Sequence, residues 1–189
     1  LPKLVKEFSI EKVQKGGAVF NIQRLDFINS FYIKQKSIKT LTELCLPYLP
    51  ESATTLPRKT LESIVDLHRM RMKKLSDITH MTDYFFKDHL EYDTKILGWK
   101  EMKPGDIKEA LLLCDNVLKN VVKWDAKNIE TSLLEAASSF AQGFGGQGNR
   151  GYLLWPLRVA LSGREASAGP FEIAEILGKE RTLERIQAA

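Results

Sequence analysis

The chain has 189 residues, of which 43% are hydrophobic and 28% are charged, a composition typical of a folded globular protein. Its formal net charge is +4. No run approaches the roughly 18 consecutive apolar residues that a membrane-spanning helix needs, so we expect no membrane partner. The two cysteines, Cys45 and Cys114, each lie in an apolar run. This predicts buried thiols in a reducing, cytoplasmic environment and excludes a disulfide framework.

The first residue is Leu1 rather than methionine, and no secretory signal pattern follows it. We therefore expect a piece of a longer protein.

Helical periodicity dominates the chain, and alternating strand patterns are scarce. Ser37 is the expected N-cap of a helix that ends before Pro47. Pro57 fits the first turn of a long helix that runs to about Ile78. Asn128 is the expected N-cap of a later helix, and Gly163 and Gly178 are expected to end helices. The predicted helices cover residues 25–38, 38–46, 57–78, 106–122, 129–140, 156–161, 170–177 and 179–187.

The pattern predicts an all-α protein with two packing units that meet near residues 92–103, an aromatic and polar stretch punctuated by glycine and proline. We expect residues 37–98 to form a first helical domain and residues 99–189 a second. No internal repeat of 20–50 residues is visible.

The basic charge is concentrated in one segment. Residues 58–74 contain six lysines and arginines against two carboxylates, so this segment carries +4 and the remainder sums to about zero. A local basic helix suits a polyanion, because neutralised phosphates release counterions. The alternative is a solvated helix face that binds nothing.

Arg71 stands out on a helical wheel of this segment. At about 100° per residue it falls about 20° from Ile64, at the edge of the apolar stripe. Burial of an unpaired guanidinium is costly. Three possibilities stay open: the side chain extends to water, it pairs with an internal carboxylate, or it awaits an external acceptor such as a base edge or phosphate.

Arg158 lies near the start of the predicted helix over residues 156–161. A cation at this position can cooperate with the free N–H groups of the first turn in holding a phosphate or a polar base. Tyr152 and Trp155 supply rings on which a base could stack. The alternative is that Leu154 and Trp155 belong to the core.

No catalytic, cofactor or metal site is predicted. The glycine-rich stretch at residues 142–151 lacks the lysine and hydroxyl of a phosphate-binding loop and follows a helix, so it reads as a connector. The three histidines have no cysteine partners at metal-ligand spacing. No serine has the sequence context of a nucleophile.

Several runs resemble the end of bacterial-type glutamyl-tRNA synthetases. The most specific are PLRVALSGREAS at residues 156–167, FEI at 171–173 and LGKERTLERI at 177–186. The opening of the chain contributes FSIEKV at 8–13, GAVF at 17–20, LDFIN at 25–29 and YI at 32–33, and the middle contributes RMRMKKL at 69–75. The resemblance covers essentially all 189 residues.

The resemblance implies the anticodon-binding part of a class I aminoacyl-tRNA synthetase, preceded at residues 1–36 by the end of a stem-contact region. Arg71 matches the arginine that contacts the third anticodon base. Arg158 and the loop formed by Ser167, Ala168, Gly169 and Pro170 match the surface that meets the first two bases. The parent enzyme would join glutamate to tRNA(Glu) with ATP and Mg²⁺, but the family's nucleotide-binding motifs do not occur here. The resemblance thus implies a monomeric tRNA-binding module.

Three positions depart from the family pattern. Phe27 stands where the family often has tryptophan, and Ser167-Ala168 stands where it usually has a Ser/Thr-Pro pair. No arginine occurs at residues 137–140, where some members have one for the middle base.

The competing hypothesis is an all-α protein-interaction domain whose basic helix is merely solvated.

Overall fold

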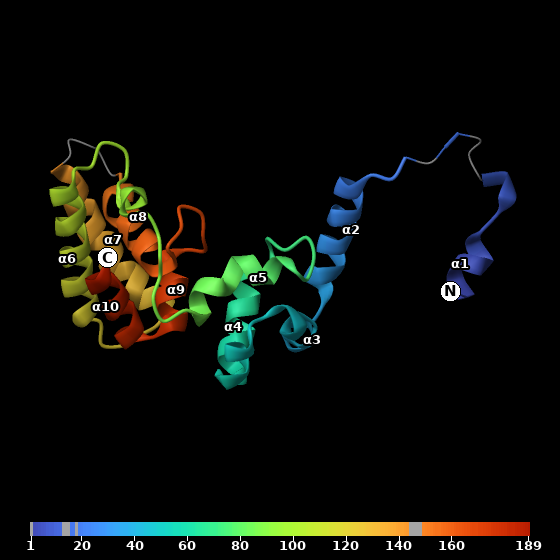
Figure 1. The fold of residues 1–189 in the computed structure, drawn as a ribbon, viewed down its shortest axis with the longest axis horizontal. Coiled ribbons are helices and arrows are strands. Elements are labelled where there is room, and N and C mark those ends of the chain that lie inside the picture. The colour runs from blue at the N-terminus through green and yellow to red at the C-terminus, as the bar shows by residue number, and fades with distance from the viewer. Residues whose placement is uncertain (1, 13–15, 18, 144–148) are drawn as a thin grey trace.

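The computed structural model describes residues 2–12, 16–17, 19–143 and 149–189. Within them the chain is all-α and contains no strand, as predicted (Figure 1). The α-helices are α1 (Pro2–Glu7), α2 (Ile22–Gln35), α3 (Ile38–Cys45), α4 (Arg58–Arg69), α5 (Asp77–Thr82), α6 (Pro104–Lys119), α7 (Ala126–Gln142), α8 (Gly151–Ser162), α9 (Pro170–Leu177) and α10 (Lys179–Ala188). Short 3₁₀ helices connect them: η1 (Ile10–Lys12), η2 (Leu46–Tyr48), η3 (Glu51–Thr55), η4 (Asp83–Phe86) and η5 (Thr94–Leu97).

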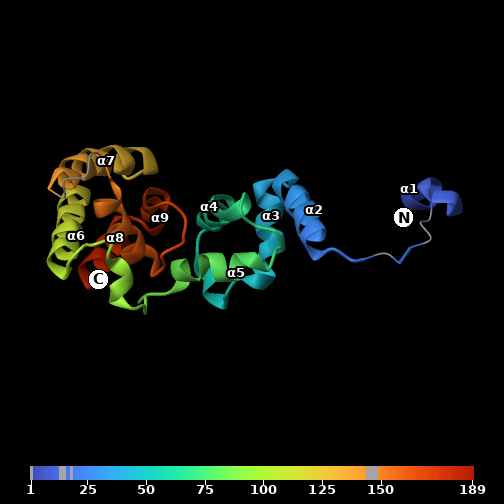
Figure 2. The same cartoon turned by 90° about the horizontal axis from the view of Figure 1, so that it is seen from above.

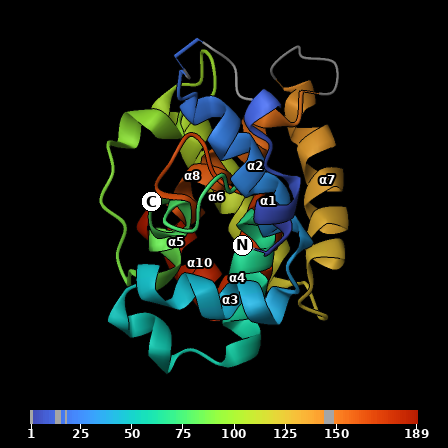
Figure 3. The same ribbon diagram turned by 90° about the vertical axis from the view of Figure 1, so that its right-hand side faces the viewer.

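The molecule is elongated. Helices α6 to α10 form a compact bundle at one end, α3 to α5 lie in the middle, and α2 and α1 reach the opposite end (Figures 1 and 2). In the bundle, α6 packs against α7, α8 and α10, and α9 contacts α4 of the middle section. Viewed along its length, the molecule shows α3 and α4 below α2, and α7 on the outside of the bundle (Figure 3).

Buried apolar side chains of the described residues form two clusters. The smaller cluster joins α2, α3, α4 and the start of α5 through Ile33, Leu41, Cys45, Val65, Met72 and Ile78. The larger cluster fills the α6–α10 bundle and includes Tyr84 and Phe85 of η4. Both cysteines are buried and free, as expected. The domain limits at residues 36/37 and 98/99 stay a prediction.

Several helix ends follow the predicted signals. The Ser37 side chain accepts a hydrogen bond from the Thr40 N–H and caps α3. Gly163 adopts a left-handed φ of 67° at the end of α8, and Gly178 adopts a φ of 80° between α9 and α10. At α7 the prediction was wrong: the cap is Asp125, whose carboxylate accepts from the Asn128 N–H, and the helix therefore starts earlier.

The long helix predicted to run to Ile78 is interrupted. Helix α4 ends at Arg69, and α5 starts only at Asp77. The Asp77 carboxylate Oδ2 accepts the N–H groups of Lys73 and Lys74 at 2.8 and 3.0 Å, so these donors are satisfied without a helix. Met72 is completely buried between the two helices and fixes the turn against the smaller cluster.

The helix expected over residues 156–161 is longer and begins at Gly151, so Pro156 lies inside it. Leu153, Leu157 and Leu161 recur every four residues and have no exposed area. Their burial outweighs the roughly 3 kcal/mol cost of an internal proline. Arg158 is consequently in the body of α8, and the predicted role of first-turn N–H groups beside it was wrong.

Candidate anticodon-binding site

The turn between α4 and α5 presents Arg71 at the surface. The Arg71 N–H donates to the His68 carbonyl at 2.9 Å, which closes the turn after α4. The side chain then leaves the helix, so its position on the helical wheel does not describe its surroundings. Among the described residues no carboxylate pairs with it. Its Nη1 instead donates to the Ser167 carbonyl at 2.8 Å.

This hydrogen bond joins two segments that are 96 residues apart in sequence. The partner segment is the loop at residues 163–169, which connects α8 to α9 beside the middle section of the molecule (Figure 1). Two groups of candidate residues that the sequence could only name separately therefore meet at one place. Within the described part of the chain, Arg71 uses one of its five N–H donors, and the side chain is exposed, so donors remain for a ligand.

The loop is held in a defined shape. Ala168 is 1% exposed, and Pro170 is buried as the first residue of α9. The Ser167 hydroxyl donates to the Ala168 carbonyl at 3.0 Å. A Cβ at Gly169 would come within 2.2 Å of Glu172 Oε2, a carboxylate oxygen that is buried without a partner. A side chain at Gly169 would thus displace Glu172.

Tyr84 is a buried side chain that supports the loop at residues 163–169. Its side chain is 1% exposed, its hydroxyl lies 3.4 Å from His68 Nε2, and the Ala168 backbone hydrogen-bonds to it. Burial raises the pKa of Tyr84 and lowers the pKa of His68. Both groups are therefore neutral near pH 7. The other ring nitrogen of His68, Nδ1, lies 2.9 Å from the Ile64 carbonyl, so α4 and the loop are tied together through buried polar groups.

Arg164 fixes the other end of the loop. Its guanidinium bonds to the His80 carbonyl and to the Asp83 carboxylate, and it lies 5.8 Å from the centre of the Tyr84 ring. Although burial raises the pKa of Asp83, the cations of Lys87 and Arg164 outweigh it and hold the pKa below its ordinary value. Neither Tyr84 nor Arg164 was predicted. No spacing rule marks them, because each acts through residues distant in sequence.

Arg158 takes no part in the hydrogen bond between Arg71 and Ser167. Its guanidinium is 6.0 Å from the centre of the Trp155 ring, and its Nε is buried with no hydrogen-bond partner. The Trp155 ring packs against the Trp99 ring at a tilt of 39°, with the ring centres 4.7 Å apart, and its Nε1 donates to the Ile96 carbonyl at 2.9 Å. Trp155 is thus half-buried and held by the bundle, in line with the core alternative.

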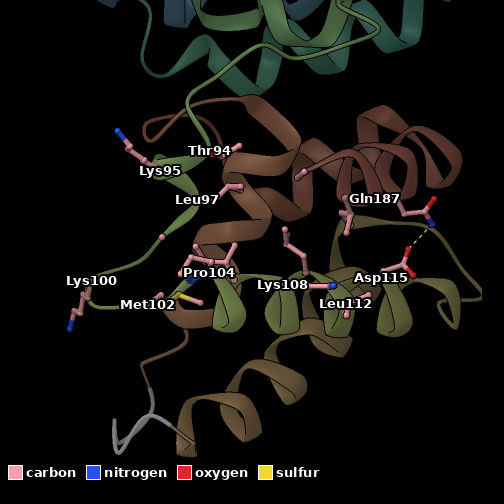
Figure 4. Close-up of a pocket in the computed structure, with 15 residues that line it drawn as sticks. Thr94, Lys95, Leu97, Lys100, Met102, Pro104, Lys108, Leu112, Asp115 and Gln187 are labelled. Carbon is pink, nitrogen blue, oxygen red and sulfur yellow. Dashed lines mark hydrogen bonds between the residues drawn. The ribbon is translucent and has the colours of Figure 1, made fainter.

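A separate hollow of about 760 Å³ lies between η5, α6 and α10. None of the six candidate residues lines it, although its volume is that of a ligand site. Figure 4 shows Pro104, Lys108 and Leu112 along the α6 wall, and Gln187 Nε2 donating to Asp115 Oδ1 at 3.0 Å.

Among the helices that the structure describes, none combines the length and the apolar character that a membrane span requires. No group of three or more histidine, cysteine, aspartate or glutamate side chains in that part of the chain could hold a metal ion. The glycine-rich stretch of the sequence falls partly at residues 144–148, outside the described residues.

His68 should make the stability of the fold depend on pH. Because burial lowers its pKa below 6.5, the unfolded chain binds more protons as the pH falls through 6.5. The free energy of unfolding should therefore be highest above pH 6.5, and it should decline by up to about 1 kcal/mol between pH 7.5 and 5.5. Denaturant titrations at both pH values check this.

His68→Gln should remove that decline, whereas His80→Gln, at an exposed position, should retain it. An unchanged decline in His68→Gln would contradict the assignment.

Comparison with known proteins decides the family. Residues 40–189 match the family model described as anticodon binding domain. The chain belongs to this family. This anticodon-binding domain is 32% identical to the glutamate–tRNA ligase of Moorella thermoacetica over 195 aligned positions. The alignment covers all of this chain and 38% of that protein. The domain is 34% identical to glutamate–tRNA ligase 2 of Rubrobacter xylanophilus, covering 97% of this chain and 37% of that protein.

Solved structures show the same fold. A glutamate tRNA ligase from Elizabethkingia meningosepticum, in complex with its amino acid, matches with a TM-score of 0.78 at 24% identity, over 99% of this chain and 36% of that one. The glutamate-tRNA synthetase of Elizabethkingia anophelis matches with a TM-score of 0.72 at 23% identity, over 99% and 35%. The anticodon-binding domain thus spans less than two fifths of the length of the relatives it matches.

Proposed function

We propose that this chain reads the anticodon of tRNA(Glu) as part of a glutamate–tRNA ligase. The family match over residues 40–189 and the named relatives support this. The observation that carries the proposal is the hydrogen bond from Arg71 Nη1 to the Ser167 carbonyl. It brings an exposed guanidinium and a shaped loop to one surface, which is what recognition of an unstacked base requires.

Each candidate residue has a role in this proposal. Arg71 reads the third anticodon base with the N–H donors that Ser167 leaves unused. The loop from Ser167 to Pro170 and the Arg158 guanidinium meet the first two bases. The Arg158 guanidinium lies 6.0 Å from the centre of the Trp155 ring, and among the described residues its Nε is a buried donor without an acceptor, which a polar group of a base would satisfy.

The catalytic chemistry belongs to another part of the enzyme. In this proposal ATP, Mg²⁺ and glutamate bind outside the chain, which contributes no catalytic residue, and the enzyme is a cytoplasmic monomer. Residues 1–36 would be the end of a stem-contact region. The large apolar side chains exposed there fit a surface that packs against further protein: Val5, Phe8, Ile10, Val19, Phe20, Ile22, Leu25, Phe27, Ile28, Phe31 and Tyr32.

Binding to tRNA tests the proposal against the protein-interaction alternative. The chain should bind a tRNA(Glu) transcript more tightly than the same transcript with a changed third anticodon base, by about tenfold or more. The preference should persist when salt is raised, because base contacts release few counterions. Weak binding that ignores the anticodon and disappears with salt would favour the alternative, a domain whose basic segment is merely solvated.

A further inference from the structure

A second hollow lies between α2, η2 and the turn that carries Arg71. Its volume is about 320 Å³. Its walls come from three elements and consist of Asn29, Tyr32, Ile33, Lys36, Tyr48, Lys74, Leu75 and Ser76. It shares no residue with the candidate anticodon-binding site, and nothing in the proposed function uses it.

The chemistry of this hollow is that of an anion site. Lys36 and Lys74 are exposed, and neither forms an ion pair within the described residues. No carboxylate lines the walls, whereas the remaining polar side chains all carry N–H or O–H donors. Two cations among neutral donors suit a phosphate group, and the Asp77 carboxylate beside Lys74 is engaged by the N–H groups of Lys73 and Lys74.

Hydrogen bonds hold the backbone on both sides of the hollow. The Lys74 N–H donates to Asp77 Oδ2, and the Lys36 N–H donates to the Ile33 carbonyl at 3.2 Å. Arg69 Nη2 donates to the Lys34 carbonyl at 2.6 Å and thereby ties the end of α2 to the end of α4. The two walls of the hollow are therefore fixed relative to each other before any ligand binds, which lowers the entropic cost of binding.

The hollow is next to the proposed base reader. Lys74 follows Arg71 by three residues, so their Cα atoms lie within about 11 Å. We propose that Lys36 and Lys74 hold a backbone phosphate of the RNA strand whose base Arg71 reads. This inference rests on the proposed function. It adds a contact that supplies affinity and register but no base specificity.

The salt dependence of tRNA binding tests this contact. The double variant K36A/K74A of the 189-residue chain should make the slope of log K against log salt shallower by about 0.7 to 0.9, the change for one phosphate contact. Binding should weaken by about fivefold at 0.15 M salt and converge with the unaltered chain near 1 M. The preference for the correct third base should not change, because Arg71 is intact.

A matched control comes from the same section of the molecule. K39A/K59A removes two exposed lysines that do not line the hollow, so it changes the net charge equally. Its slope should stay within about 0.5 of the unaltered chain. All four side chains are exposed, so thermal unfolding should show each variant folded.

The outcomes separate this inference from the proposed function. Equal slopes for the two double variants would overturn the phosphate contact while leaving base reading by Arg71 intact. Binding of inorganic phosphate to the hollow, with no change of RNA slope in K36A/K74A, would also overturn it, since the site would then hold a free anion. If the unaltered chain shows no preference for the correct third base, the proposed function is overturned instead.

Discussion

Replacement of Arg71 with alanine should reduce discrimination at the third anticodon base by about 1–3 kcal/mol, or roughly 5- to 150-fold in the ratio of dissociation constants. The reason is that a bidentate guanidinium donor is lost from an exposed position that the Ser167 carbonyl orients. Arg71→Gln is the more informative variant, because it keeps hydrogen-bonding capacity but loses charge and the planar fork. Binding of all four third-base tRNAs measures the effect.

Lys73→Ala is the control for this experiment. Lys73 is exposed two residues away, and its backbone N–H, not its side chain, contacts Asp77. Its replacement should weaken binding modestly and equally for all four tRNAs. If Arg71→Gln keeps the full base preference, Arg71 is not the reader.

Arg185→Ala should cause a large loss of stability, about 3–5 kcal/mol. Arg185 is 6% exposed, and burial lowers its pKa to about 10, which leaves it charged at neutral pH. Its guanidinium donates to the carbonyls of Leu161, Tyr84 and Lys87 at 2.5, 2.7 and 2.8 Å. Alanine would leave buried carbonyls without donors.

Denaturant unfolding followed by circular dichroism measures this loss. Arg185→Lys should recover only part of it, because one ammonium cannot replace a fork that reaches three carbonyls. Arg181→Ala is the matched control: Arg181 is only partly buried, contacts the Lys87 carbonyl at 2.9 Å, and should cost less than half as much. A loss below about 1 kcal/mol for Arg185→Ala would contradict the role of its three hydrogen bonds.

The fold class followed from the sequence because helical signals are local. Ser37 caps α3, and Gly163 and Gly178 end helices, through bonds and dihedral angles that involve only near neighbours. The predictions failed where a tertiary interaction outweighed the local pattern. Asp77 breaks the long helix by capturing two backbone N–H groups, and buried leucines carry α8 through Pro156.

The candidate site, too, could be predicted from the sequence only in part. The resemblance named Arg71 and the loop from Ser167 to Pro170, but no pattern in the sequence could show that they touch. Their contact depends on Tyr84 and Arg164, which act across 80 or more residues and have no motif. The resemblance also named Arg158. Its position beside Trp155 depends on where α8 begins, and the periodicity predicted that start at the wrong residue.

Amide hydrogen exchange with an isolated tRNA(Glu) anticodon stem-loop tests the anticodon assignment most directly. Bound RNA should slow exchange at residues 71–74 and 163–169, which the Arg71–Ser167 bond holds together, and should leave the α6 wall of the 760 Å³ hollow unchanged. A stem-loop with a changed third base should give much weaker protection at the same concentration. Protection absent from both segments, or equal for the two stem-loops, would contradict anticodon recognition at this site.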